Sequence, residues 1–148
     1  MTTERIITGE EAFFLCLTSA ASQTEKMCEE TLRGCGITVA EYTLLRIVEN
    51  TPDITAGEAR ARLYATAPSI AQLVAQLERK NLLQRGRDPG DARRLPLRLT
   101  ANGKKSVQKA KRAISQLLSH LKLPQGLLDS LTTNLSTYLS SLPPYGTK

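Results

Sequence analysis

The sequence predicts a mainly α-helical protein with one small β-hairpin. Capping boxes, in which a threonine precedes a glutamate by three residues, occur at Thr8, Thr38 and Thr55 and predict three helix starts. Apolar residues recur at helical spacing over much of the chain, and a loop rich in glycine, proline and aspartate precedes an alternating segment. A chain of 148 residues with this pattern is expected to form one domain, or one lobe that carries dimerising extensions.

Composition narrows the class of protein further. Hydrophobic residues make up 41% of the chain and aromatic residues only 4%, so we expect a core of Leu, Ile, Val and Ala side chains. Because we find neither a run of about 18 apolar residues nor a signal peptide, we expect no membrane partner. The three cysteines, an odd number, favour a reducing cytoplasm over a disulfide scaffold.

Three helices are predicted before the hairpin. The first covers residues 10–32 and ends at a turn that contains two glycines. The second follows Thr38 and ends before Thr51, and the third is short and covers residues 55–63. The turn at 64–66 then leads into a fourth helix, so that a helix-turn-helix unit is expected here.

The fourth helix has one clearly apolar face. Its apolar residues recur at i, i+3, i+4 and i+7 and are Ile70, Leu73, Val74 and Leu77. This spacing predicts a buried stripe. The remaining faces carry small, amide and basic side chains, which suit a surface that meets a polar partner.

A basic β-hairpin follows the fourth helix. Residues 82–85 and 95–99 are predicted strands, and the loop 86–94 holds two glycines, a proline and two aspartates, which are typical of a hairpin tip. Pro96 suits an edge position, and Thr100 is expected to cap the next helix. A helix-turn-helix followed by a basic hairpin is the layout of a winged helix-turn-helix, a module that binds DNA.

Two further helices are predicted after the hairpin, one over residues 103–121 and one that ends at a pair of prolines. Both have an apolar stripe, as does the first helix, whereas a winged lobe needs only about residues 37–103. We therefore assign 1–36 as an N-terminal dimerisation helix, 104–142 as C-terminal dimerisation helices and 143–148 as a tail. Packing of these helices on their own lobe is the alternative.

Charge is divided unevenly along the chain. Residues 1–58 contain ten acidic and four basic residues, whereas residues 79–112 contain twelve of the twenty basic residues and only two acidic ones. A basic block after an acidic one indicates an anionic partner for that block alone. In combination with the hairpin, this pattern favours double-stranded DNA over a merely solvated basic surface.

The chain resembles the MarR family of bacterial transcriptional regulators over roughly residues 8–142. The most specific similarity is the wing pattern D-x-R followed by L-T-x-x-G, which is present as Asp91, Arg93 and residues 99–103. The resemblance implies a winged helix-turn-helix fold with dimerisation helices. It also implies a homodimer that binds a palindromic operator, usually as a repressor.

Two other segments carry the same resemblance. Residues 37–42 are similar to the start of the family's second helix, and residues 77–83 to the end of its recognition helix. Asn81 stands where many members have glycine, and asparagine tolerates the left-handed conformation that such a position requires.

The DNA-binding residues are predicted on the fourth helix and the wing, and they are Thr66, Ala67, Pro68, Ser69, Gln72, Gln76, Arg87, Arg93 and Arg94. The Ser69 hydroxyl and the nearby backbone N–H groups can bind phosphate. Gln72 and Gln76 are one turn apart, and an amide can bind adenine bidentately. Arg93 is expected to enter a narrow A·T minor groove, with its guanidinium held by a charge-assisted pair with Asp91. The other two arginines are expected near phosphates.

The family generally couples DNA binding to a signal, either a small ligand or the oxidation of a cysteine. The candidate redox residues Cys16, Cys28 and Cys35 lie on or beside the first helix. Cys16 resembles the reactive thiol of the family's organic-hydroperoxide sensors, but it is displaced by about two residues, and Cys28 stands where those sensors have tyrosine. On an intact helix Cys28 and Cys35 would be roughly 10.5 Å apart, which is too far for a disulfide. A ligand pocket, or thiols that are simply core residues, are the alternatives.

The sequence supports no enzyme class. It has a single histidine, His120, and it lacks a glycine-rich phosphate loop and a nucleophile-elbow pattern, so we predict neither catalysis nor a cofactor. His120 fits no compact metal-binding motif, and no metal site is predicted. The preferred interpretation is a sequence-specific transcriptional regulator. The alternatives are a winged-helix protein-interaction module and a non-specific DNA-binding protein.

Overall fold

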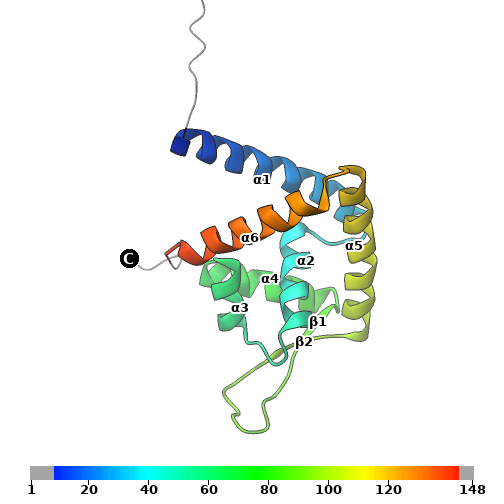
Figure 1. Ribbon diagram of the computed structural model, residues 1–148. Helices are drawn as coiled ribbons and strands as arrows, with labels where there is room; N and C mark the ends of the chain where they lie inside the picture. Colours follow the sequence, from blue (N-terminus) through cyan, green and yellow to red (C-terminus); the bar gives the residue numbers. More distant parts are fainter. Residues whose placement is uncertain (1–8, 144–148) are drawn as a thin grey trace, which may run out of the picture.

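The computed structural model describes residues 9–143 and confirms the predicted fold class. This part of the chain forms six helices and one two-stranded antiparallel hairpin (Figure 1). The elements are α1 Gly9–Arg33, α2 Val39–Asn50, α3 Ala56–Leu63, α4 Ala67–Arg79, β1 Leu83–Arg85, β2 Leu97–Leu99, α5 Ala101–His120 and α6 Gln125–Ser141. Thr8, the predicted cap of the first helix, lies outside the described residues.

The core of the lobe lies between the end of α1, α2, α4, the hairpin and the first half of α5. Its largest buried apolar side chains include Leu32, Leu44, Leu45, Ile54, Val74, Leu77, Leu83, Leu97 and Val107. In the predicted stripe of α4, Ile70, Val74 and Leu77 are buried and Leu73 is half-buried. Each fully buried aliphatic side chain of this kind contributes roughly 1.5–3 kcal/mol. This packing fixes the inner face of α4 and leaves its outer face free.

Threonine side chains cap α2, α3 and α5 where the sequence predicts them. Thr38 and Thr55 form complete capping boxes with Glu41 and Glu58, respectively. The Thr100 hydroxyl accepts a hydrogen bond from a backbone N–H in the first turn of α5 at 2.9 Å. These local bonds satisfy backbone N–H groups that have no partner within the helix, and so they determine where each helix begins.

The hairpin pairs β1 with β2 in an antiparallel register that places Leu83 opposite Leu99. Just before β2, Pro96 forms an isolated bridge with Thr55. The Leu97 N–H donates to the carbonyl of the residue before Thr55 at 2.7 Å. The segment that precedes α3 therefore extends the hairpin and attaches it to the helix-turn-helix.

Gly103 lies where α5 passes close to the backbone that leads into β1. A Cβ atom at this position would lie 1.9 Å from the carbonyl oxygen of Leu82, well inside van der Waals contact. That carbonyl accepts a hydrogen bond from the Thr100 N–H at 3.2 Å. The glycine of the L-T-x-x-G pattern is thus required by a close approach between two backbone segments.

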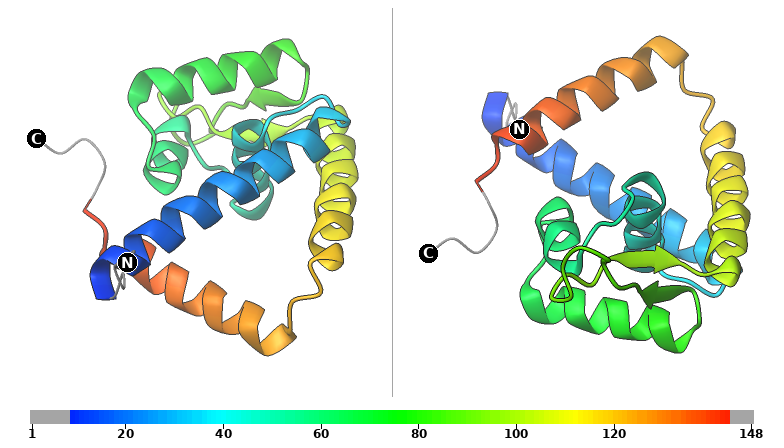
Figure 2. Two further views of the ribbon diagram at one scale, coloured as in Figure 1. Left: turned by 90° about the horizontal axis from the view of Figure 1, so that it is seen from above. Right: turned by 90° about the horizontal axis from the view of Figure 1, so that it is seen from below.

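Helices α1, α5 and α6 extend from the lobe and outline a triangle (Figure 2). Where α1 begins and α6 ends, the rings of Phe13 and Tyr138 meet edge to face with centroids 5.4 Å apart. The hydroxyl of Tyr64, from the turn before α4, donates to the carbonyl of Leu139 at 2.7 Å. This bond connects the end of α6 to the helix-turn-helix.

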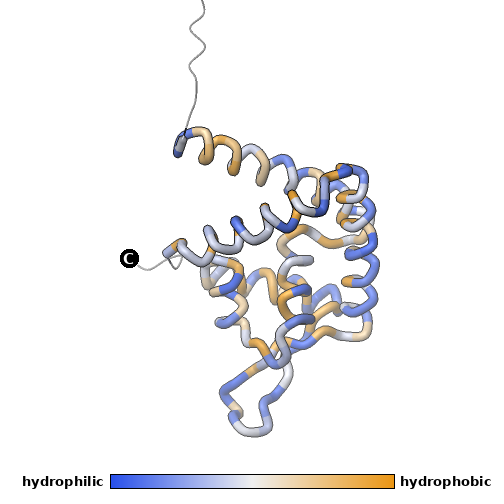
Figure 3. Tube along the Cα trace, in the orientation of Figure 1, coloured by the Kyte–Doolittle hydropathy of each residue, from blue (hydrophilic) through white to orange (hydrophobic). Residues whose placement is uncertain are grey.

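Apolar residues are frequent on these helices, most clearly in the first half of α1 (Figure 3), and many of their side chains are exposed. The exposed large apolar side chains on these helices are Phe13, Phe14, Leu15, Leu118, Leu127, Leu128, Leu131, Leu135 and Leu139. Phe14 is 61% exposed, and α6 has no buried residue. Contiguous apolar surface of this kind marks an interaction site. None of the helices within residues 9–143 is long and apolar enough to cross a membrane.

We expect Gly103→Ala to destabilise the protein by about 3 kcal/mol, because the added methyl group overlaps the backbone of Leu82. Chemical denaturation followed by circular dichroism measures this change. Gly126→Ala is the matched control, since it is also a helical glycine and nothing lies within 4 Å of an added Cβ there. Equal stability of the two variants would contradict the close approach.

Candidate nucleic-acid interface

The start of α4 presents the predicted phosphate-binding residues to solvent. Thr66 is the N-cap, and its Oγ1 accepts a hydrogen bond from the backbone N–H of Ser69 at 3.2 Å. The hydroxyls of Thr66 and Ser69 lie 2.8 Å apart. Thr66, Ala67, Pro68 and Ser69 are all exposed. The positive end of the helix dipole and two hydroxyls therefore lie together on an open surface, which suits an anionic oxygen.

The outer face of α4 carries the predicted base-reading residues. Gln72 is exposed and Gln76 half-buried. Both line a hollow of about 330 Å³ together with Ser69. The other walls of this hollow are formed by Ala40 of α2, Leu63 at the end of α3, Ala65 of the following turn and further residues of α4. The structure thus brings Ser69, Gln72 and Gln76 to one face of one helix.

A buried carboxylate anchors the far end of α4. Glu41 is only 2% exposed, and its Oε2 accepts hydrogen bonds from the Thr38 N–H at 2.9 Å and from the Lys80 Nζ at 2.7 Å. Lys80 is the C-cap of α4 and also donates to the Gly36 carbonyl at 3.0 Å. Asn81 follows in the left-handed conformation that the sequence predicts, with φ of 54°. The Glu41–Lys80 pair is not among the predicted interactions, although an acid within the apolar face of α2 is a signal for one.

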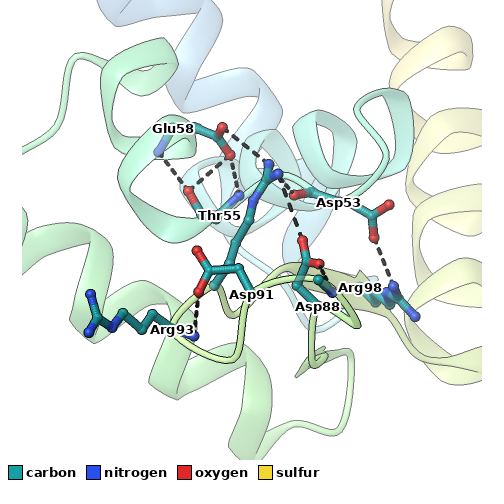
Figure 4. Close-up of polar contacts among 9 residues, drawn as sticks. Asp53, Thr55, Glu58, Asp88, Asp91, Arg93 and Arg98 are labelled. Atoms are coloured by element: carbon teal, nitrogen blue, oxygen red, sulfur yellow. Dashed lines mark hydrogen bonds and ion pairs between the residues drawn. The ribbon is translucent and has the colours of Figure 1, made fainter.

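Asp91 orients the wing differently from the prediction. Its Oδ1 accepts a hydrogen bond from the backbone N–H of Arg93 at 2.9 Å (Figure 4). In the described part of the chain, Asp91 forms no ion pair with the Arg93 guanidinium. The predicted charge-assisted pair is therefore wrong, because the side chain two residues earlier is the right length to close a turn on the backbone. Asp88 closes a similar turn on the Gly90 N–H at 2.8 Å.

Arg94 contacts residues on the surface of the lobe and anchors the wing. Its guanidinium donates to the Asp53 carbonyl at 3.2 Å and to Glu58 Oε1 at 3.4 Å, and it lies 3.9 Å from Asp88 Oδ2 (Figure 4). Arg98 pairs with the Asp53 carboxylate at 2.8 Å. A phosphate contact by Arg94 remains a prediction and would compete with these partners. The anchoring role of both arginines is not evident from the sequence, because their partners are 36 to 45 residues away in the chain.

Glu58 links the capping of α3 to the wing. Hydrogen bonds from the Thr55 backbone and hydroxyl, and then the positive charge of Arg94, lower the pKa of this carboxyl below its ordinary value. Because the folded-state pKa is the lower one, the ionised carboxylate stabilises the fold above the ordinary glutamate pKa. This stabilisation is lost as the pH falls through the lowered pKa.

Arg87 and Arg93 are the wing arginines that stay free. Both are exposed, and neither side chain has a hydrogen bond or ion pair among residues 9–143. Figure 4 shows the Arg93 side chain extending away from the group formed by Asp53, Thr55 and Glu58. The wing therefore separates arginines that hold it in place from arginines that are available to an external anion.

The three cysteines are free thiols in different environments. Cys16 is exposed on α1, whereas Cys28 and Cys35 are half-buried. Burial, and secondarily the charge of Glu29, raises the pKa of the Cys28 thiol, so its reactive thiolate form is disfavoured. Because α1 ends at Arg33, Cys35 lies in the following turn, and the helical spacing assumed for it does not apply.

The structure shows no group of three or more metal-binding side chains within residues 9–143. His120 is exposed at the end of α5, where its Nδ1 lies 2.6 Å from the Gln116 carbonyl.

Comparison with known proteins places this geometry among related folds. The model of the MarR family matches residues 36–94. The HTH-type transcriptional regulator SarZ of Staphylococcus epidermidis is 26% identical over 129 residues, which cover 85% of this chain and 86% of SarZ.

Two solved structures share the fold over most of the chain. CouR from Rhodococcus jostii RHA1 bound to p-coumaroyl-CoA superimposes with a TM-score of 0.80 at 18% identity, covering 90% of this chain and 95% of CouR. The Staphylococcus aureus MepR–DNA complex superimposes with a TM-score of 0.74 at 24% identity, covering 92% of this chain and all of the MepR chain. At these identities the superpositions establish the shared fold.

We expect Asp91→Asn to preserve the turn at the wing tip and Asp91→Ala to open it, because the amide oxygen of asparagine replaces the lost acceptor. Both variants remove the same charge, so they differ only in this hydrogen bond. Solvent exchange of the Arg93 backbone amide, measured by NMR, should accelerate several-fold in the alanine variant alone. If both variants accelerated it equally, the charge of Asp91 rather than its turn would hold the wing.

Proposed function

Because the chain belongs to the MarR family of DNA-binding transcriptional regulators, we propose that it is a homodimeric repressor of a palindromic operator. We further propose that a small ligand or cysteine oxidation releases it from DNA. The observation that carries the proposal is the exposed outer face of α4 beside a wing with two unpaired arginines. Major-groove and minor-groove elements then meet DNA from one side of the lobe.

In this proposal α4 enters the major groove. Ser69 and the free N–H groups of the first turn bind a phosphate and fix the position of the helix. Gln72 and Gln76 then face base edges, where a primary amide binds the N6 and N7 atoms of adenine. Ala71, which directly precedes Gln72, is exposed and offers a methyl group to thymine.

The wing enters the adjacent minor groove. Arg93 carries a free guanidinium, and a narrow A·T-rich minor groove has the negative potential that attracts it. Arg87 lies on the same loop and binds the flanking phosphates. Arg94 and Arg98 hold the loop against the lobe. Their main contribution to DNA binding is therefore to position the loop.

The dimer is formed by the exposed apolar faces of α1 and α6. Phe13 is 50% exposed and Leu131 is 45% exposed in the isolated chain, although both are large apolar residues. A second copy can cover the same surface by two-fold symmetry, which buries each patch against its equivalent. Two copies of α4 then face successive major grooves, about one helical turn apart, as a palindrome requires.

Release requires a signal that reaches α4. The similar CouR structure binds p-coumaroyl-CoA, which supports a small organic ligand as one signal. For oxidation, Cys16 is the preferred thiol because it is exposed, whereas the raised pKa of Cys28 disfavours its thiolate. The Cys16 thiolate would attack the outer peroxide oxygen, break the O–O bond and become a sulfenic acid, while the organic hydroperoxide is reduced to its alcohol.

We expect Arg93→Ala to weaken binding to an operator duplex by about 1–3 kcal/mol, because it removes the minor-groove contact. Fluorescence anisotropy at fixed salt measures the affinity. Lys26→Ala is the matched control, since it removes one exposed positive charge on α1, far from the wing in the sequence. An unchanged affinity in Arg93→Ala, or an equal loss in both variants, would remove the wing from the proposal.

We expect an organic hydroperoxide to lower the DNA affinity of the wild-type protein and to leave that of Cys16→Ser unchanged. Cys28→Ser should respond as the wild type does, because its thiol is half-buried and disfavoured as a thiolate. The same anisotropy assay, with and without oxidant, measures both. A response that persists in Cys16→Ser would assign sensing to another residue, and no response at all would favour a small ligand.

A further inference from the structure

We propose that the turn between α1 and α2 and the outer face of α5 form a binding site for a small organic phosphate. The site is an open hollow of about 580 Å³ on the surface, and its lining includes Cys35 from the turn and Lys104, Lys105, Lys109 and Arg112 from α5. We call it the basic pocket. Its volume lies in the range of known small-molecule sites, roughly 300–1,000 Å³.

The basic pocket concentrates positive charge that the described chain does not neutralise. Four of its eight lining residues are cationic and none is acidic. Lys104, Lys105 and Arg112 make no ion pair and no side-chain hydrogen bond within residues 9–143. In the wing, by contrast, Arg94 and Arg98 are each matched by a carboxylate. A cluster of unpaired cations around a hollow attracts an anion and raises its local concentration.

The arrangement on α5 favours a compact ligand with several negative charges. The lining residues lie on adjacent turns at spacings of three and four, so their side chains converge on one face of the helix. Lysine binds phosphate as a point charge, and arginine can bind it bidentately. Ala113 and the aliphatic stems provide an apolar floor, while Gln108 and Gln116 offer amides to the hydroxyl groups of an organic phosphate.

A nucleic-acid phosphate chain is the other polyanion that could occupy such a surface. In Figure 2, α5 runs along a different edge of the molecule from α4. The proposed base-reading residues line a separate hollow on α4, and none of them lines the basic pocket. We therefore assign the pocket to a small ligand.

The basic pocket is connected to the end of α4 by hydrogen bonds. Lys109 Nζ donates to the Gly34 carbonyl at 3.1 Å, and Lys80 Nζ donates to the Gly36 carbonyl at 3.0 Å, so two lysines hold one short turn. A bound phosphate competes with Gly34 for the Lys109 ammonium and loosens the turn that Lys80 shares. This regulatory step rests on the proposed function, because its consequence is weaker DNA binding.

The binding test uses inorganic pyrophosphate as the probe and isothermal titration calorimetry of the full chain at constant ionic strength. We expect Lys105→Gln combined with Arg112→Gln to weaken pyrophosphate binding at least about tenfold. The control is Lys26→Gln combined with Arg60→Gln, which removes the same charge from exposed residues outside the pocket. Equal weakening in both, or no binding to the wild type, would overturn the proposal.

Cys35 provides a readout that is specific to the pocket. In a Cys16→Ser, Cys28→Ser background it is the single remaining thiol. Its reaction with the dianionic disulfide 5,5′-dithiobis(2-nitrobenzoate) forms a mixed disulfide and releases one thionitrobenzoate. We expect pyrophosphate to slow this reaction several-fold in a saturable manner. A rate that is independent of pyrophosphate would contradict the location of the site.

A DNA titration separates this proposal from the proposed function. Calorimetry and thiol protection need no DNA, so they can succeed or fail whatever the protein does on an operator. Suppose that the Lys105→Gln, Arg112→Gln variant bound operator as weakly as Arg93→Ala does, and that pyrophosphate did not bind to the wild-type protein. The pocket would then be a DNA contact, and the proposal would be wrong. If pyrophosphate bound in the pocket but left DNA affinity unchanged, the regulatory step alone would be contradicted.

Discussion

The arrangement of the lobe depends on the buried carboxylate of Glu41. A buried charge is strongly unfavourable unless hydrogen bonds and an opposite charge compensate for it. Glu41 receives both, from the Thr38 backbone and from Lys80. Since Thr38 starts α2 and Lys80 ends α4, the Glu41 side chain fixes the angle between these two helices. The same lysine reaches the Gly36 carbonyl, so the turn between α1 and α2 is held as well.

A second set of ionic contacts fixes the wing in the same way. Arg94 and Arg98 reach back to Glu58 and to both the carbonyl and the carboxylate of Asp53, which belong to α3 and the loop before it. These pairs are partly exposed, and each contributes little stability by itself. Their effect is geometric, because they orient the loop so that Arg87 and Arg93 remain free. Positioning and binding are therefore assigned to different arginines of the same hairpin.

Local patterns in the sequence were sufficient to predict most of the fold. The capping by Thr38, Thr55 and Thr100, the stripe of α4 and the left-handed Asn81 each depend on residues within a few positions, and these predictions are confirmed. The anchoring roles of Arg94 and Lys80 were not predicted, because their partners lie 36 and 39 residues away. The role of Asp91 was wrong in detail, since spacing alone cannot distinguish a bond to a neighbour's backbone from one to its side chain. DNA contacts and the dimer stay predictions, because both depend on molecules outside the single chain.

The most direct test of the central claim is selection of duplexes from a random DNA pool with the full-length protein, followed by anisotropy on the selected sequence at two salt concentrations. The account predicts a palindrome with half-sites about 10 base pairs apart, bound at least roughly 10³-fold more tightly than a scrambled duplex. Its affinity should fall as salt rises, since phosphate contacts release counterions. Salt-dependent binding without an enriched sequence would identify a non-specific DNA-binding protein. No DNA binding at all would contradict the account and favour a protein-interaction module.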